Sequence, residues 1–86
     1  MDRKEIIEKV NAILADQLIG VEISDVRPDL SLATDLGADS IDAVDISMAI
    51  ERTFSISLPE SVWDDLKDYR VNEIYDMVGE LIEKQQ

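Results

Sequence analysis

Ser40 is the residue of this chain best placed to do chemistry. It follows a glycine turn and stands between two aspartates, in the stretch Leu36-Gly37-Ala38-Asp39-Ser40-Ile41-Asp42. A run with apolar residues at helical intervals begins directly after it, so we expect Ser40 at a helix N-terminus with its hydroxyl exposed. A hydroxyl in that position is an accessible point for covalent attachment.

The same surroundings argue against a catalytic serine. A nucleophilic serine needs a base within hydrogen-bond reach, and the chain has no histidine and no cysteine. None of the lysines forms an S-x-x-K spacing with Ser40, and the G-x-S-x-G arrangement is absent. Asp39 and Asp42 stand where carboxylates cap a helix. We therefore predict a protein without intrinsic catalytic activity and without catalytic residues.

Four aspartates near Ser40 raise the question of a metal site. A calcium-binding EF-hand loop needs a glycine at position six and a glutamate at position twelve. Counted from Asp35, Gly37 stands at position three and Ile46 at position twelve. The spacing excludes this loop, and we expect no metal site beyond weak, adventitious binding of divalent cations.

The net charge of the chain limits the classes of molecule that it can bind. Lys and Arg number 8 against 20 Asp and Glu, which gives a formal net charge of −12 over 86 residues. Such a field repels nucleic acid and anionic lipid, and it attracts basic protein surfaces. Acidity alone is equally well explained as a means of staying in solution, so it informs on function only where it surrounds a site.

Length and composition limit the architecture. The chain has room for one domain, 1–86, and its hydrophobic content of 45% is ordinary for a folded protein. It has no cysteine, which excludes disulfides and thiolate metal sites and suits a reducing compartment. No window approaches the ~18 apolar residues of a membrane span, and the opening residues do not read as a signal peptide. We expect a monomeric, cytoplasmic protein.

Periodicity predicts four helices. The first spans 2–18, with Asp2 as N-cap and Gly20 as a C-cap candidate. A connection of roughly twenty residues follows, and its scattered apolar side chains indicate that it lies against the core. Within it, 21–24 alternates like a short strand but has no partner run.

The later helices are shorter or better marked. The second is expected over 40–54, with Asp39 as N-cap and Asp42 at the third helical position. The third opens at Pro59 and ends near Leu66 to Tyr69, and the fourth covers about 71–84. The predicted fold class is all-α: a small four-helix bundle with a long loop between helices 1 and 2 and a short third helix.

The second helix has two apolar faces. At 100° per residue, one stripe fits the core: Ala43, Ile46, Ile50 and Phe54. A second strip lies almost opposite: Ile41, Val44 and Met48. Asp45 borders one flank of this strip and Glu51 borders the other. An apolar strip with an acidic rim is typical of a transient protein interface, and we favour this interpretation over packing of Ile41 and Val44 beneath the long loop. Met48 is expected to be its most exposed residue.

The stretch from Gly37 to Phe54 resembles the signature region of acyl carrier proteins. The shared pieces are Gly37-Ala38-Asp39-Ser40-Ile41-Asp42, Val44-Asp45-Ile46, Met48-Ala49-Ile50-Glu51 and Phe54, with isoleucine where leucine usually follows the serine. The resemblance extends over almost the whole chain, including Gly20-Val21 in the long loop and Leu58-Pro59 before the third helix.

This resemblance implies a carrier of acyl groups. Ser40 would hold a covalent 4′-phosphopantetheine, attached by a separate phosphopantetheinyl transferase, and the terminal thiol would hold acyl intermediates as thioesters. Asp39 would help the transferase position its metal and substrate. Acyl-processing enzymes of fatty acid or related lipid biosynthesis, with basic docking patches, would bind the second helix through these residues: Ile41, Asp42, Val44, Asp45, Met48 and Glu51.

Departures from the family pattern leave alternatives open. Arg52 and Thr53 replace the usual acidic run, which weakens that end of the rim. The stretch from Pro59 to Val71 is about two residues longer than usual and carries Trp63 and Tyr69, which we assign to core or loop packing. A dedicated carrier for a specialised pathway (polyketide, lipid or aminoacyl) is the first alternative. A non-catalytic acidic interaction module is the second.

Overall fold

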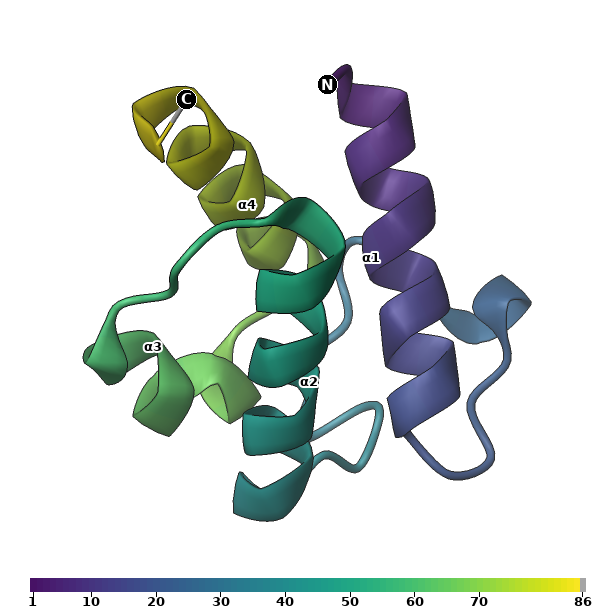
Figure 1. Cartoon of the computed structure of the whole chain (residues 1–86). Helices are drawn as coiled ribbons and strands as arrows, with labels where there is room; N and C mark the ends of the chain where they lie inside the picture. Colours follow the sequence, from purple (N-terminus) through teal and green to yellow (C-terminus); the bar gives the residue numbers. More distant parts are fainter. Residues whose placement is uncertain (86) are drawn as a thin grey trace.

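The computed structural model describes residues 1–85 and is built from helices joined by loops (Figure 1). Its elements in chain order are α1 (Arg3–Gln17), the 3₁₀ turn η1 (Ile23–Asp25), α2 (Ser40–Phe54), α3 (Glu60–Asp65), the 3₁₀ turn η2 (Leu66–Asp68) and α4 (Val71–Gln85). Across residues 1–85 there is no strand, only an isolated bridge between Ser31 and Arg70. The predicted all-α bundle with a long first loop and a short third helix is confirmed.

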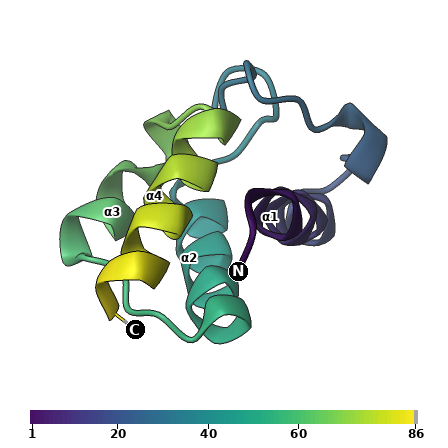
Figure 2. The same cartoon turned by 90° about the horizontal axis from the view of Figure 1, so that it is seen from above.

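Helix α2 lies at the centre of this arrangement. It contacts α1 on one side and α3 with η2 on the other, while α4 packs against α1 (Figure 2). Helix α1 begins and α4 ends at one pole of the molecule, and α2 begins at the opposite pole (Figure 1). The first residue of α2 is therefore remote from the start of α1 and from the end of α4.

Of the helix ends predicted at Asp2, Gly20 and Pro59, the first has the predicted cap and the other two differ from the prediction. Asp2 caps α1 as predicted, because its Oδ1 accepts a hydrogen bond of 2.9 Å from the Glu5 N–H. Gly20 is not the C-cap: Leu18 takes that place in an extended conformation, and Gly20 adopts a positive φ of 79° two residues later. Pro59 likewise precedes α3 as its N-cap rather than forming its first residue.

The short strand considered over 21–24 is replaced by η1. The Glu22 N–H donates to Asp25 Oδ2 at 3.0 Å, and the Asp25 N–H donates to the Glu22 carbonyl at 2.9 Å, so the two residues close one tight turn. The local capping bonds offer this backbone partners that a lone strand would lack.

The core takes residues from every helix. The predicted stripe of α2, consisting of Ala43, Ile46, Ile50 and Phe54, is buried. Opposite it, α1 contributes a buried stripe that includes Val10 and Leu14. Ser47 is the buried polar residue of α2, and its hydroxyl donates to the Ala43 carbonyl at 2.8 Å, which satisfies it within the helix.

Helices α1 and α4 are joined by a polar contact around Tyr75. The Tyr75 hydroxyl donates to Asn11 Oδ1, and the Arg3 guanidinium lies 5.7 Å from the centre of the Tyr75 ring while pairing with Asp76 at 2.7 Å. Burial raises the pKa of the Tyr75 phenol, so the hydroxyl remains a donor at neutral pH.

The long loop between α1 and α2 is tied to the segment before α4 by backbone hydrogen bonds. The Leu32 N–H donates to the Tyr69 carbonyl at 3.1 Å, and the Ala33 N–H donates to the Lys67 carbonyl at 3.0 Å. In the other direction, the Val71 N–H donates to the Leu30 carbonyl at 2.9 Å. Leu32 itself is fully buried, so the loop is fixed by both polar and apolar contacts, as its apolar residues predicted.

Leu32→Ala should lower the free energy of unfolding by about 2–5 kcal/mol, because it leaves a cavity where the loop meets the core. Ile19→Ala, in the same loop, should change it by less than about 0.5 kcal/mol, since Ile19 is fully exposed. Urea unfolding followed by circular dichroism measures both. Equal losses would show that the loop is not anchored through Leu32.

Candidate functional site

The N-terminus of α2 is closed by a reciprocal pair of hydrogen bonds. Asp39 Oδ1 accepts from the Asp42 N–H at 2.9 Å, and Asp42 Oδ2 accepts from the Asp39 N–H at 3.1 Å. This is a capping box built from two aspartates, and it confirms Asp39 as N-cap with Asp42 three residues on. Ser40 is the first residue of the helix and is exposed.

The turn before Ser40 is anchored to the long loop by a backbone hydrogen bond. Ala38 is buried and its N–H donates to the Leu32 carbonyl at 2.9 Å, which connects this turn to the anchored loop. Gly37 has a φ of 75°, and a Cβ there would meet no atom within 4 Å. Glycine is thus required by the backbone conformation rather than by crowding.

The groups close to Ser40 in sequence are poorly suited to act as bases. The two carboxylates beside it are occupied with backbone N–H groups in the capping box. The nearest basic residues in sequence are Arg27 and Arg52, and an arginine does not accept a proton near neutral pH. Over residues 1–85, no three acidic side chains gather closely enough to hold a metal ion. The hydroxyl is thus exposed at the helix end, where another molecule can reach it.

The second apolar strip of α2 is open to solvent. Ile41 is 72% exposed, Val44 40% and Met48 46%, which confirms the predicted strip and excludes packing of Ile41 and Val44 beneath the loop. Ile41 rather than Met48 is the most exposed of the three, because it lies in the first turn, beyond the reach of neighbouring helices. The strip leads directly away from Ser40 along the helix.

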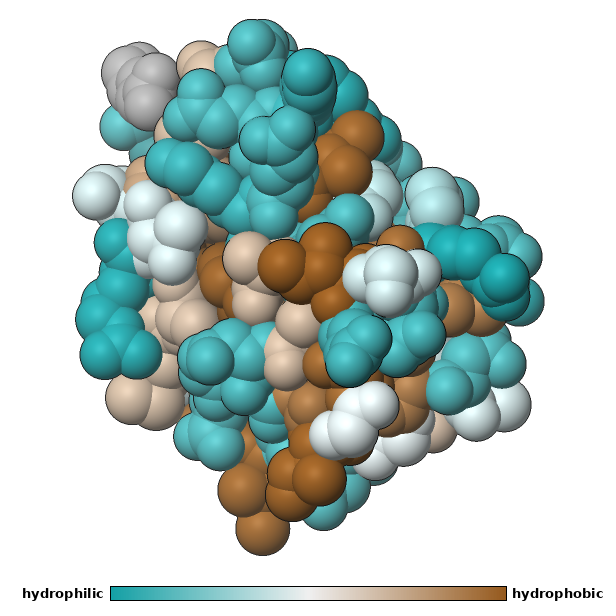
Figure 3. Space-filling view, turned by 90° about the vertical axis from the view of Figure 1, so that its right-hand side faces the viewer, coloured by the Kyte–Doolittle hydropathy of each residue, from teal (hydrophilic) through white to brown (hydrophobic). Residues whose placement is uncertain are grey.

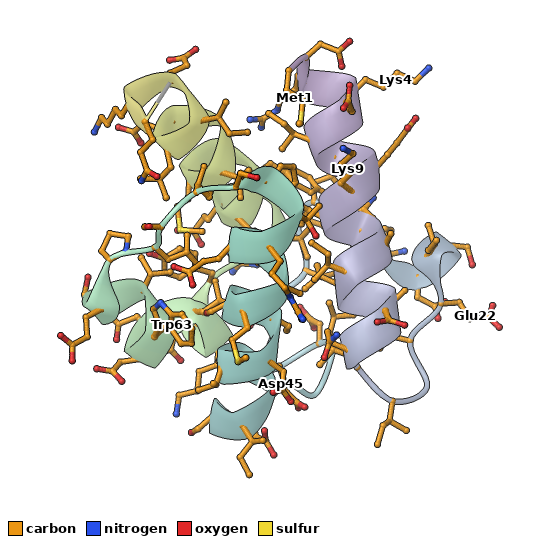
Figure 4. The ribbon with its side chains drawn as sticks, in the orientation of Figure 1. Met1, Lys4, Lys9, Glu22, Asp45 and Trp63 are labelled. Carbon is orange, nitrogen blue, oxygen red and sulfur yellow. The ribbon has the colours of Figure 1, made fainter. Side chains whose placement is uncertain are left out.

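The three acidic residues of α2 that were assigned to docking, of which Asp45 and Glu51 form the rim, differ in their surroundings. Asp45 is exposed and points away from the bundle on α2 (Figure 4). Asp42 is half-buried in the capping box. Glu51 is half-buried too, and its Oε2 accepts a hydrogen bond of 2.8 Å from the Leu58 N–H. Asp45 therefore presents the most accessible negative charge of the three.

Sequence analysis missed this second role of Glu51. Ser55 takes a left-handed conformation with φ 56°, which turns the chain back so that Leu58 meets the side chain of Glu51. The signal for such a turn is weak, because serine seldom adopts positive φ. Glu51 is consequently a link between α2 and the loop that leads to α3.

The two aromatic residues singled out in the sequence lie on the α3 side. Trp63 projects from α3 (Figure 4), and both Trp63 and Tyr69 are half-buried against the core, in line with the packing role assigned to them.

On the face formed by α1 and the long loop, apolar surface gathers mainly in the lower half, toward the pole where α2 begins, whereas the upper part is mostly hydrophilic (Figure 3). No helix within 1–85 is long and apolar enough to cross a bilayer.

Comparison with known proteins identifies the family. Residues 8–70 match the family described as "Phosphopantetheine attachment site". The chain is 44% identical over 68 residues to an acyl carrier protein of Guillardia theta, covering 79% of this chain and 83% of that protein. It is 42% identical over 79 residues to an acyl carrier protein of Thermosynechococcus vestitus, covering 92% of this chain and 94% of that one.

These matches choose between the two classes that the residues left open. The matched range includes the whole of α2 and the turn before it, where the exposed serine lies. A non-catalytic interaction module would need neither this serine nor a phosphopantetheine. The chain belongs to the acyl carrier protein family, whose members act as carriers through a covalently attached 4′-phosphopantetheine.

Proposed function

We propose that Ser40 is the residue that bears the 4′-phosphopantetheine. The observation that carries this proposal is an exposed hydroxyl at the first position of α2, beside two carboxylates that are engaged in capping. Ser40 is exposed, so a transferase can reach the hydroxyl. When attached, the group supplies a terminal thiol on which an acyl chain is held as a thioester.

The residues of this chain fix the position of the hydroxyl and leave the activation to the transferase. In the loading step, Ser40 Oγ forms a bond to the phosphopantetheinyl phosphorus of coenzyme A. The pyrophosphate bond breaks, adenosine 3′,5′-bisphosphate leaves, and the hydroxyl proton passes to a base of the transferase. The capping box holds the Ser40 backbone in helical geometry throughout. The chain itself is proposed to have no catalytic activity.

Asp39 has two roles in this proposal. As N-cap it satisfies the Asp42 N–H, and by resemblance to the family it helps the transferase position its metal ion. Only one of its oxygens is required for the cap, so the carboxylate can serve both. The two roles differ in chemistry, because the cap needs an acceptor oxygen whereas a metal contact benefits from a negative charge.

The partner enzymes are proposed to dock on α2. The strip of Ile41, Val44 and Met48 supplies an apolar centre, and Asp45 supplies an exposed charge at its edge. This pattern matches a transient interface with a basic enzyme surface. We propose fatty acid biosynthesis as the pathway, with a specialised lipid, polyketide or aminoacyl pathway as the alternative. Intact-mass analysis of the carrier from its native cell, with its acyl chain still attached, separates these.

Incubation with coenzyme A and a phosphopantetheinyl transferase should add one phosphopantetheine group to the chain, as measured by intact mass. Ser40→Ala should abolish the addition, because no other oxygen occupies this position. Ser61→Ala is the matched control, since Ser61 is also an exposed serine in the first turn of a helix. Addition to the Ser40→Ala protein would defeat the assignment.

Asp39→Asn and Asp39→Ala separate the two roles of Asp39. Asparagine keeps an acceptor oxygen, so Asp39→Asn should leave the stability within about 0.5 kcal/mol, while Asp39→Ala should cost about 1 kcal/mol. Both should slow loading by about 10- to 100-fold if the charge serves the metal. Thermal unfolding and the initial rate of loading are the measurements. Normal loading of Asp39→Asn would restrict Asp39 to capping.

Asp45→Lys should slow association of the holo protein with a basic partner enzyme, more so at low salt than at high salt. Glu83→Lys is the control, because it makes the same charge change at an exposed site in the last turn of α4, and α4 ends at the pole opposite the start of α2 (Figure 1). Stopped-flow association rates at two ionic strengths decide the matter. If both variants slow association equally, the effect comes from net charge and not from docking at α2.

A further inference from the structure

Arg52 is an isolated positive charge on the surface of α2. It is the only Lys or Arg between residues 28 and 66, and it lies exposed in the last turn of the helix. The ion pairs within residues 1–85 involve Arg3, Lys9 and Lys84, and none of them engages Arg52. A cation near a helix C-terminus stabilises the helix. That effect needs only the charge, and it leaves the donors of the guanidinium available to another molecule.

Helical geometry places Arg52 on the same flank of the apolar strip as Asp45. Seven residues advance the helix by two turns less roughly 20°, so the two side chains leave it in nearly the same direction, about 10 Å apart along its axis. Met48 lies between them, three residues after Asp45 and four before Arg52. The flank thus carries a negative charge nearer Ser40, an apolar side chain, and then a positive charge.

On the opposite flank, the negative charge of Glu51 is less accessible than the positive charge of Arg52. Glu51, next to Arg52 in sequence, turns its Oε2 toward the Leu58 N–H at 2.8 Å and is half-buried. Its carbonyl also accepts from the Ser55 and Ile56 N–H groups. Because Glu51 is engaged with the loop that leads to α3, Arg52 is the more exposed charge at this end of the strip.

The surface around Arg52 is hollowed on both sides. A groove of about 270 Å³ is lined by Arg52 with Met48 and Glu51. A larger groove of about 550 Å³ separates α2 from α1, where Ala12 and Ala49 are small, and Asp16 stands in the same lining as Arg52. Asp16 forms no ion pair with Arg52 among the described residues. Side chains of a partner can therefore reach the guanidinium from either side.

We propose that Arg52 pairs with a carboxylate, from Asp or Glu, of the partner enzyme that docks on α2. This inference rests on the docking role proposed above and names the charge pattern that the partner must have. Its basic group faces Asp45, an apolar side chain covers Met48, and its carboxylate faces Arg52. A guanidinium binds a carboxylate through two parallel N–H···O bonds, which fixes orientation as well as attraction.

This pattern selects among partners and sets their direction along α2. A uniformly basic surface is attracted by Asp45 and repelled by Arg52, so it binds less well than a surface with one acidic group about 10 Å from its basic group. A partner bound in the reverse direction would place like charges together at both positions. The correct direction brings the same part of the partner to Ser40 each time.

The experiment uses the holo protein and an acyl-processing enzyme from the same cell that accepts it as a substrate. The Kd and the kcat/KM for the carrier are measured for the wild type, Arg52→Gln and Arg52→Glu. We expect affinity to fall about 2- to 5-fold for Arg52→Gln and about 5- to 30-fold for Arg52→Glu. A uniformly basic partner would instead bind Arg52→Glu more tightly, because the carrier becomes more acidic. Unchanged or tighter binding of Arg52→Glu overturns the proposal.

Two matched variants test the reason for any loss. Lys4→Glu makes the same change of charge on α1 near the opposite pole (Figure 4) and should leave the Kd within about 2-fold. Asp16→Asn removes the carboxylate across the groove and should do the same. If either reproduces the loss of Arg52→Glu, Arg52 acts through net charge or through α1, and the proposal fails.

A charge swap gives the direct test of the pair. Replacing the partner's acidic residue opposite Arg52 by lysine should restore the affinity of Arg52→Glu to within about 3-fold of the wild type. No restoration at any acidic residue of the partner's docking face overturns the pairing. A concentration-dependent dimer of the wild type that Arg52→Glu abolishes would also overturn it, because the carboxylate would then come from a second copy.

Failure of this proposal is distinguishable from failure of the proposed function. Loading of Ser40 is scored by intact mass before any binding is measured, and all variants keep Ser40. If no variant loads, the function proposed for Ser40 fails. If all load completely and Arg52→Glu binds its partner as the wild type does, only the role of Arg52 fails.

Discussion

The backbone hydrogen bonds between the long loop and the segment before α4 fix the position of the N-terminus of α2 within the fold. A loop of this length loses much conformational entropy when it is ordered, and its polar groups need partners wherever it lies against the core. The N–H groups of Leu32 and Ala33 find carbonyls in η2 and at Tyr69, and Val71 returns a bond to Leu30. The Leu32 side chain is buried at the same place. Through Ala38, which bonds back to Leu32, this anchoring reaches the residue before Asp39.

As a consequence of this anchoring, the N-terminus of α2 is fixed in place, while the Ser40 hydroxyl at that end has no activating group bonded to it. In the capping box, one oxygen of each of the two carboxylates nearest to Ser40 accepts a backbone N–H, so these groups hold the helix end in place. A carrier benefits from this division, because its attachment point must be presented to several enzymes without reacting by itself. With the docking proposed for α2, the specificity of each reaction would come from the surface of α2 and from the partner.

The sequence predicted those features that depend on neighbouring residues. Helical spacing identified α2 and its two faces, and the aspartates at 39 and 42 identified its cap, because both signals are local. The hydrogen bonds that anchor Leu32 and its neighbours could not be predicted from the sequence. They join residues more than thirty positions apart, and they involve backbone atoms, which are the same whatever the side chain. The inward turn of Glu51 depends on the left-handed conformation of Ser55, which is uncommon for serine.

Arg52 shows how a structure changes the meaning of a sequence departure. In the sequence, it reads as a weakening of an acidic rim. In three dimensions, Glu51 is engaged with Leu58, and Arg52 lies two helical turns from Asp45 on one flank. The relevant quantity is therefore the arrangement of opposite charges along the strip, which net charge does not describe.

The electrostatics at Ser40 favour a free arm. The N-terminus of a helix attracts a phosphate through its dipole and its unpaired N–H groups. Here, the Asp42 N–H is already bonded to Asp39, and the carboxylates of Asp39 and Asp42 lie at the same helix end. A phosphodiester on Ser40 would thus meet like charge where it would otherwise bind. Because the covalent bond alone would retain the phosphopantetheine proposed for Ser40, this repulsion would cost no occupancy. It would keep the arm in solvent, where an enzyme docked along α2 could bind it.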